Sequence, residues 1–301
     1  MVKKPSELRL IDRGSWSELI RRNESYRQNR QSPFGVPPIE LDEIYFPICE
    51  RIWSLWSRKT TERLKTPLII GITGSVAVGK TTVAEAMKDL LESKPFNLDT
   101  ELVSTDNFLY PNEVLTNNRI FDRKGFPESF DYPAILEFLK GLTIEGEPME
   151  IPTYSHEIYD IIDRTMVVKP SDVLIIEGVN ILQTPKVHTN RSETQAIRDY
   201  VDFSIYIDAE EAHIKDWYTK RFLNYCEAAR SGTNSFFSQF KDLSFDQTND
   251  LALSIWTAIN STNLLENISP SMEFADLVLR KGEDHSISQL TVPRDWLSNW
   301  I

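Results

Sequence analysis

The chain of 301 residues carries 45 acidic and 33 basic side chains, and its formal net charge is −12 at pH 7. This acidic balance argues against non-specific binding to nucleic acids or to anionic membranes. Because 41% of the residues are hydrophobic and no apolar run approaches the roughly 18 to 20 residues that cross a bilayer, we expect a globular cytoplasmic protein without a membrane segment.

Residues 1–65 predict a helical extension that packs on a core domain. The segment up to about Pro38 is polar and weakly periodic, and it predicts one helix over residues 15–28 followed by a proline-rich loop. From Leu41 onward, apolar side chains recur with helical spacing. Pro47 interrupts this pattern and predicts a kink or an early end, because a proline inside a helix removes a backbone donor.

The most specific local signal is a phosphate-binding loop. The apolar run 68–73 predicts a buried strand, and residues 74–81 then match the pattern G-x-x-x-x-G-K-S/T. Glycines let the backbone turn so that its N–H groups face phosphate oxygens, and the positive end of the next helix adds to the attraction. An ordinary glycine-bearing turn with a solvated lysine is the alternative. The predicted nucleotide-binding residues are Gly74, Ser75, Val76, Ala77, Val78, Gly79, Lys80, Thr81 and Thr82.

Further apolar runs follow the loop at residues 102–105, 173–176, 203–207 and 277–279. Helical stretches separate most of them, which predicts a mostly parallel sheet covered by helices on both faces. We therefore expect an α/β fold of the P-loop NTPase type over residues 66–301, with a helical acceptor and lid region at about 209–270.

Catalytic side chains are expected where parallel strands end, because ligands bind beyond the carboxyl ends of such strands. Asp106 follows the second apolar run and is placed to accept a proton from a substrate hydroxyl, although a turn or helix-cap aspartate fits the position equally well. Glu177 ends the third run, as expected for a carboxylate that holds Mg²⁺ together with Thr81; a solvated strand-end glutamate is the alternative. Lys80 is placed to reach the β- and γ-phosphates of a nucleotide.

Six ordered blocks of the chain resemble the bacterial type I pantothenate kinases, which belong to the phosphoribulokinase and uridine kinase group of P-loop kinases. The blocks are residues 74–81, 104–112, 124–131, 152–160, 176–183 and 201–208. The likeness extends from about residue 44 to residue 281. It implies ATP-dependent phosphorylation of the primary hydroxyl of pantothenate, the first step towards coenzyme A, with Mg²⁺ as cofactor and a homodimer as the assembly.

The resemblance also implies roles for individual residues. Asp106 matches the catalytic base of the family, and Lys80 and Arg221 match residues that stabilise the transferring phosphoryl group. Judged by its helix alone, Arg221 is a solvated basic residue on an amphipathic helix. The residues that match the pantothenate pocket of the family are Tyr154, His156, Tyr218 and Asn260. Judged by their residue types alone, they are more simply explained as core residues with hydrogen-bonded polar groups or as turn residues.

A group of aromatic residues has two interpretations. It comprises Phe222, Tyr225, Phe236, Phe237 and Phe240. These side chains either form a wall for an extended substrate or pack as an ordinary core, and the second interpretation is preferred for aromatic residues at helical spacing. Tyr225 stands where the family often has phenylalanine, so the acceptor pocket is expected to differ there.

Glu85 departs from the family pattern. Related kinases commonly carry a basic residue five positions after the loop lysine, where it helps to bind a phosphate of coenzyme A during feedback inhibition. An acidic side chain repels phosphate, so we expect catalysis to persist while coenzyme A acts as a weak or altered effector. The local alternative is that Glu85 suits the first turns of a helix, where a carboxylate complements the dipole.

Two other functions stay open from the sequence. One is a kinase of the same group that acts on a nucleoside or a sugar acid, and the other is a nucleotide-binding regulatory protein without useful turnover. The tail at residues 291–301 lies outside the resemblance. Because exposed tryptophans are unusual, its Trp296 and Trp300 predict that the tail docks on the body or on another subunit.

Overall fold

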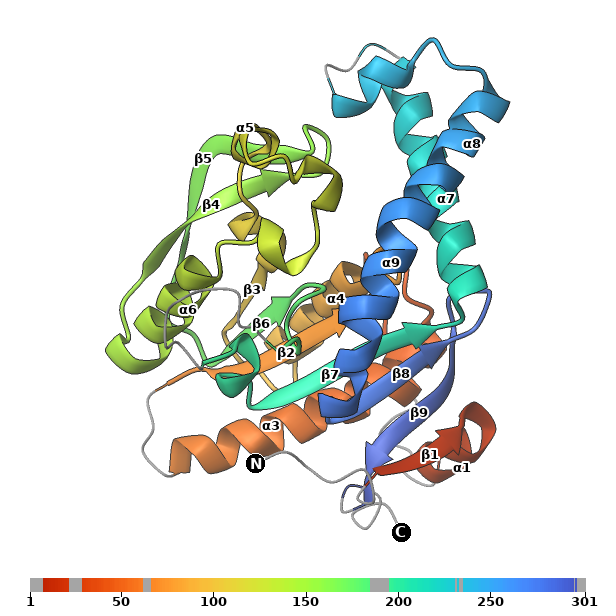
Figure 1. Cartoon of the computed structure of the whole chain (residues 1–301). Coiled ribbons are helices and arrows are strands. Elements are labelled where there is room, and N and C mark those ends of the chain that lie inside the picture. The colour runs from red at the N-terminus through yellow and green to blue at the C-terminus, as the bar shows by residue number, and fades with distance from the viewer. Residues whose placement is uncertain are drawn as a thin grey trace.

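A seven-stranded sheet forms the centre of the molecule (Figure 1). The computed structural model describes residues 8–21, 29–61, 66–184, 195–230, 232, 235–294 and 296. The strand order is β1-β9-β8-β7-β2-β6-β3. These strands are β1 (Leu8–Asp12), β2 (Leu68–Gly74), β3 (Thr100–Ser104), β6 (Val173–Glu177), β7 (Phe203–Ala209), β8 (Leu277–Lys281) and β9 (Ile287–Pro293). The five strands from β8 to β3 run parallel, while β9 and β1 complete one edge in antiparallel pairs.

The five parallel strands coincide with the apolar runs of the sequence, which confirms the predicted mostly parallel α/β sheet. Every residue of β2 and of β6 is buried, as expected for strands that are covered on both faces. The register pairs Glu177 of β6 with Ile72 of β2 and with Ser104 of β3. The carboxyl ends of these three strands therefore meet beside the loop that follows β2.

Helices surround the sheet (Figure 1). Their bounds are α1 (Arg13–Arg21), α2 (Pro38–Glu40), α3 (Phe46–Thr61), α4 (Lys80–Glu92), α5 (Asn112–Asn117), α6 (Tyr132–Lys140), α7 (Glu211–Arg230), α8 (Phe245–Ile255) and α9 (Ser261–Asn263). Helices α3 and α4 pack against each other and against β2. Among the described helices, none combines the length and the apolar character that a membrane crossing requires.

The N-terminal segment differs in detail from the predicted helical extension. It contributes the edge strand β1, which the sequence pattern misses because Ile11 alone is buried among its residues. The predicted helix over 15–28 is present as α1 up to Arg21, and its remaining residues lie outside the described ranges. Pro47 does not end the next helix. The π-helical turn Leu41–Tyr45 comes immediately before α3. It shifts the hydrogen-bond register next to Pro47, which has no N–H to donate.

The C-terminal tail docks on the body of the protein through Trp296. This side chain is 2% exposed and lies in the main hydrophobic core. Its ring meets those of Trp16 and Phe203 edge to face, at centroid distances of 5.8 and 6.4 Å. The predicted docking is confirmed for Trp296, and Trp300 lies outside the described residues.

Two structures rise above the carboxyl ends of the central strands (Figure 1). One is the antiparallel hairpin of β4 (Met149–Ser155) and β5 (Asp160–Val168). The other, called the arm below, consists of α7, the 3₁₀ turn Phe236–Phe240 and α8. The backbone N–H of Phe236 donates to the carbonyl of Glu157 at 3.1 Å, and the rings of Phe236 and Tyr159 lie 4.6 Å apart. The hairpin and the arm therefore meet above the carboxyl ends of the central strands.

Candidate active site

The phosphate loop leaves β2 at Gly74, which has a φ of +145°. A Cβ atom at this position would lie 2.3 Å from the carbonyl oxygen of Ile207 on β7, so the close approach of the two strands requires glycine. Gly79 has a φ of +87° and is the N-cap of α4. The loop thus turns back tightly and delivers Lys80 and Thr81 as the first residues of that helix.

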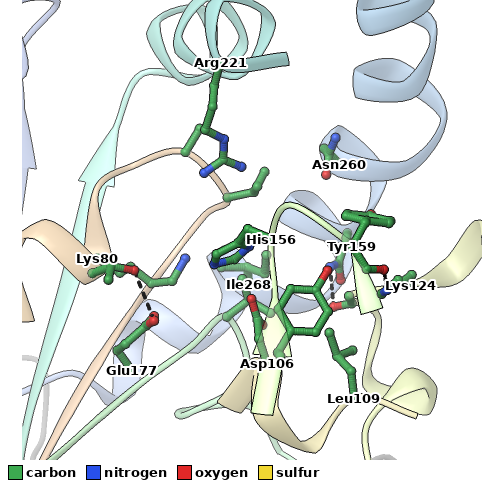
Figure 2. A pocket seen from close by; sticks show the side chains of 17 residues that line it. Lys80, Asp106, Leu109, Lys124, His156, Tyr159, Glu177, Arg221, Asn260 and Ile268 are labelled. Atoms are coloured by element: carbon green, nitrogen blue, oxygen red, sulfur yellow. Dashed lines mark hydrogen bonds between the residues drawn. The ribbon is translucent and has the colours of Figure 1, made fainter. Parts of the chain in front are cut away.

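Lys80 and Thr81 point to different partners in the site. The Lys80 ammonium donates to the carbonyl of Ser75 at 2.9 Å, which holds the side chain over the loop. Burial lowers the pKa of Lys80, and the carboxylates of Glu177 and Asp106 oppose that effect. The Thr81 hydroxyl donates to Oε1 of Glu177 at 3.1 Å (Figure 2).

Glu177 is the last residue of β6 and is only 5% exposed. Burial raises its pKa, and the nearby Lys80 charge works in the opposite direction. A solvated strand-end glutamate, the alternative interpretation, does not describe this side chain. Its carboxylate and the Thr81 hydroxyl lie together next to the loop, and oxygens of these kinds are what Mg²⁺ prefers.

Asp106 is placed by a short 3₁₀ turn, Thr105–Phe108, which follows β3 directly. The cap of this turn is Ser104, whose hydroxyl accepts from the N–H of Asp106 at 3.3 Å. Since Ser104 caps the turn, the Asp106 carboxylate is not needed as a cap. The side chain is half-buried and faces the cavity between the loop and the hairpin (Figure 2).

The hairpin supplies Tyr154 and His156. Its position relative to Asp106 is set by Asn107, whose Oδ1 accepts from the N–H of Tyr154 at 2.9 Å. The rings of Tyr154 and His156 then meet at 5.2 Å. Desolvation lowers the pKa of His156, and the nearby positive charge of Arg221 strengthens this effect. We therefore expect a neutral imidazole at physiological pH.

Lys124 is a further cation in the site. Its ammonium donates to Oδ1 of Asn112 and to the carbonyl of Tyr159, both at 2.6 Å, and it lies 4.1 Å from the centre of the Tyr159 ring (Figure 2). Burial lowers the pKa of Lys124 from 10.5 to about 8. Tyr159 adopts a left-handed φ of +58°, which turns its carbonyl towards Lys124 and towards the Asn112 amide.

The arm and the segment after it contribute Arg221 and Asn260. Arg221 projects from α7 towards the phosphate loop, and Asn260 lies across the cavity from Lys80 (Figure 2). Asn260 ends a π-helical turn, Trp256–Asn260, and the ring of Tyr218 on α7 lies 5.6 Å from the ring of Trp256 in the same turn. Turns of this type expand a helix locally and are frequent at functional sites.

These elements enclose a cavity of about 170 Å³. The predicted site residues that line it are Val76, Ala77, Lys80, Thr81, Asp106, Tyr154, His156, Glu177, Arg221 and Asn260. The remaining loop residues, Gly74, Ser75, Val78, Gly79 and Thr82, lie outside its wall, and so does Tyr218. The Asp106 carboxylate shares this cavity with Lys80, Arg221 and Lys124. This combination suits the transfer of an anionic phosphoryl group to a hydroxyl.

Comparison with known proteins agrees with this chemistry. A model of the Phosphoribulokinase / Uridine kinase family matches residues 69–217. Pantothenate kinase of Bacillus subtilis (strain 168) is 40% identical over 270 residues, which cover 85% of this chain and 84% of the relative. Pantothenate kinase of Bacillus velezensis is 45% identical over 232 residues, which cover 76% of this chain and 73% of the relative. The chain belongs to the pantothenate kinase family.

Solved structures confirm the fold of this pantothenate kinase family member. A candidate fructose transport system kinase from Silicibacter sp. TM1040 has a TM-score of 0.54 at 20% identity and covers 73% of this chain and 92% of its own. The YGR205w protein has a TM-score of 0.53 at 16% identity, and the match covers 82% of this chain and 98% of that protein. The resemblance stated from the six sequence blocks is therefore confirmed at the level of family and fold.

The aromatic group on the arm packs as a small second core in this kinase. Phe222 and Phe237 are both 6% exposed and meet edge to face at 5.7 Å. Tyr225 stacks on Phe237 at 4.9 Å, while Phe236 and Phe240 pack at the border of the cluster. The core interpretation of these residues is confirmed. Their contact with the acceptor site runs through Tyr159, which touches Phe236 and Phe237.

The sequence reasoning missed Lys124, Asn112 and Asn263. Asn263 is buried, and its amide donates to the carbonyl of Gly125 at 2.8 Å, which ties α9 to the segment that carries Lys124. A lone lysine before a glycine and two scattered asparagines form no recognisable spacing. The only signal was that Lys124 and Asn112 fall inside two of the matched blocks.

Proposed function

We propose that this chain transfers the γ-phosphoryl group of ATP to the primary hydroxyl of pantothenate, which is the first step of coenzyme A biosynthesis. The observation that carries the proposal is a single cavity lined by Asp106, Lys80 and Arg221 together with residues of the phosphate loop. Relatives that are 40 to 45% identical over most of the chain are named pantothenate kinases. The chain is therefore an ATP-dependent alcohol kinase of small molecules.

Asp106 acts in this proposal as the general base. Its carboxylate accepts the proton of the pantothenate hydroxyl while the hydroxyl oxygen bonds to the γ-phosphorus and the bond to the β–γ bridging oxygen breaks. Lys80 and Arg221 balance the charge that moves onto the transferring group and onto ADP. Because Arg221 comes from α7 in the arm, closure of the arm would bring its planar guanidinium to the phosphates.

The nucleotide and the metal ion fit the residues that are present. The glycines at 74 and 79 leave the loop without side chains where the backbone turns, as a phosphate cradle requires. Thr81 and Glu177 would hold Mg²⁺, and among the described residues they are not part of any cluster of three or more acidic, histidine or cysteine ligands. When bound there, Mg²⁺ would offset the negative charge of the nucleotide phosphates.

The acceptor pocket is proposed to consist of Tyr154, His156 and Asn260, with Lys124 added. Their amide, imidazole and phenol groups offer hydrogen bonds to a small polar acid, and Lys124 offers a positive charge to its carboxylate. Tyr218 is proposed to act on the pocket through its hydroxyl, from a ring that packs against Trp256 in the turn that ends at Asn260.

The proposal is tested by ADP release coupled to product mass, with Mg-ATP and a panel of pantothenate, pantetheine, uridine, cytidine and glycerate. Phosphopantothenate is expected as the dominant product. Dominant turnover of another acceptor would retain the phosphate site and reject the acceptor assignment. No turnover of any acceptor, with measurable ATP binding, would reject the kinase in favour of a regulatory nucleotide-binding protein.

Coenzyme A is proposed as an effector with weakened feedback. Glu85 is half-buried on α4, one helical turn after Thr81, where a carboxylate disfavours a bound phosphate. We expect Glu85→Arg to strengthen competition of coenzyme A with ATP by about tenfold, the gain from one charge-assisted contact. Glu92→Arg, at the last residue of the same helix, is the matched control. Equal inhibition of wild type and Glu85→Arg would contradict this role.

The organisation of the chain is proposed in the same way. Residues 1–65 form an extension on the kinase domain 66–301, within which about 209–270 is the acceptor and lid region; the pairing of β1 with β9 supports their close packing. A homodimer and a cytoplasmic location are proposed from the family resemblance and from the use of ATP. Light scattering should give about twice the chain mass of 34.8 kDa.

A further inference from the structure

A buried hydrogen bond links the two strands that carry the acidic residues of the site. β3 and β6 run parallel, and their last residues, Ser104 and Glu177, are register partners. Just beyond them, the Thr105 hydroxyl donates to Oδ1 of Asn180 at 2.7 Å. Both side chains are 0% exposed. The bond therefore joins the Asp106 turn to the segment after Glu177 in a place without water.

Gly178 leaves room for this bond. A Cβ atom at Gly178 would lie 1.9 Å from the Thr105 hydroxyl oxygen and 3.0 Å from Oδ1 of Asn180. Any other residue would displace the hydroxyl from its acceptor. The Gly178 N–H is itself held by the carbonyl of Ile72 on β2 at 3.0 Å. The segment that carries the acceptor of the Thr105 hydroxyl is thus attached at Gly178 to the strand that leads into the phosphate loop.

The hydrogen bond of Thr105 acts on the residue next to it. Thr105 is the first and Asp106 the second residue of the 3₁₀ turn, and Asn107 is held on the other side by its bond with the Tyr154 N–H. Asp106 therefore lies between two anchored neighbours. Rotation of its peptide would break one of these two hydrogen bonds.

The stability of the fold does not explain why Asn180 is present. Its Nδ2 is buried and has no acceptor among the described residues, and a buried donor without a partner destabilises the folded state. A pair of small apolar residues in place of Thr105 and Asn180 would avoid this cost. We infer that Thr105 and Asn180 are positioning residues for Asp106, and this inference rests on the proposed pantothenate kinase reaction.

The test compares Thr105→Val, which removes the hydroxyl at nearly constant shape, with Thr105→Ser, which keeps it. Because a displacement of about 1 Å in a reacting group costs on the order of 100-fold in rate, we expect Thr105→Val to lower kcat by about 30- to 100-fold. The KM for pantothenate and the Kd for ATP should stay within about threefold, since no lining contact is removed, and Thr105→Ser should restore most of kcat. Thr100→Val is the control, because Thr100 is a buried, hydrogen-bonded threonine at the other end of β3.

A second variant tests the same bond from its other side. Asn180→Ala should lower kcat by a similar factor, and the double variant Thr105→Val/Asn180→Ala should lose little more than either single variant, because both remove one interaction. Additive losses, a full kcat in Thr105→Val, or a parallel loss of ATP affinity that Thr105→Ser does not restore would overturn the inference. Wild-type protein measured alongside separates the two proposals. An inactive wild type refutes the kinase reaction, whereas an active wild type matched by Thr105→Val refutes the positioning role alone.

Discussion

Replacement of Lys124 by methionine should stabilise the protein at neutral pH while weakening its function. Lys124 is 8% exposed and carries its charge into a site that is largely removed from water. Methionine has a similar length and no charge, so it removes the cost of burying an ammonium group. The same change removes a cation from the acceptor pocket, and we expect the KM for pantothenate, a carboxylate, to rise by about tenfold.

The size of the stability change follows from the pKa of Lys124. A fall from 10.5 to about 8 in the folded state corresponds to about 3 kcal/mol of destabilisation by the charged form. Methionine leaves Oδ1 of Asn112 without its lysine donor, which costs about 1 kcal/mol. The carbonyl of Tyr159 keeps its bond from the Asn112 amide. The net gain at pH 7 is therefore about 2 kcal/mol, or about 3 to 6 °C in Tm for a protein of this size.

The sign of the effect gives it a distinctive pH dependence. The folded pKa of Lys124 lies below the unfolded one, so the penalty is complete below pH 8 and fades as the pH rises towards 10.5. At pH 9.5 the penalty falls to about 1.5 kcal/mol, and the advantage of Lys124→Met should nearly vanish. Thermal unfolding at pH 7 and pH 9.5 measures both values. Lys140→Met, at an exposed lysine, is the control for loss of charge alone. A lower Tm for Lys124→Met at pH 7, or the same shift at both pH values, would refute the reasoning.

Other variants test the remaining parts of the site. Asp106→Asn should lower kcat by about 10²- to 10⁴-fold with ATP affinity, measured by calorimetry, nearly unchanged; unchanged turnover would remove Asp106 from the mechanism. Gly74→Ala would place a Cβ atom 2.3 Å from the Ile207 carbonyl oxygen at a positive φ, and we expect ATP binding to be lost and Tm to fall; wild-type ATP affinity would contradict the tight-turn argument. Tyr218→Phe removes a hydroxyl that the family resemblance assigns to the pantothenate pocket, so the KM for pantothenate should rise by about three- to tenfold at constant kcat. A loss confined to kcat would assign Tyr218 another role.

The nucleotide half of the site is readable from the chain because its signals are local. A strand, a glycine-rich turn and a helix follow one another in β2, residues 74–81 and α4. The backbone geometry of this one short segment requires its residue types, and all of them lie within a few positions of each other. The parallel strands are equally visible, because burial on both faces demands continuous apolar runs.

The other elements depend on partners that are distant in the chain. β1 has one buried residue and is a strand only because it pairs with β9 across more than 270 positions. Pro47 ends no helix, because the π-helical turn before it accommodates the missing N–H. For β1 the local pattern is weak and pairing with a distant strand overrides it, whereas at Pro47 a neighbouring turn of the same helix compensates for the proline.

The acceptor half of the site also contains residues that the sequence predicts and residues that only the fold brings together. Sequence and family resemblance predict that Asp106, Arg221 and Asn260 take part, and the fold places all three at one cavity. The environment of Lys124 and the buried bond between Thr105 and Asn180 have no counterpart in local sequence, because the partners are brought together by strand register and by the hairpin. Desolvation and hydrogen-bond geometry depend on the atoms that surround a side chain in space. Those atoms belong to segments that are distant in the chain, so only the tertiary structure brings them together.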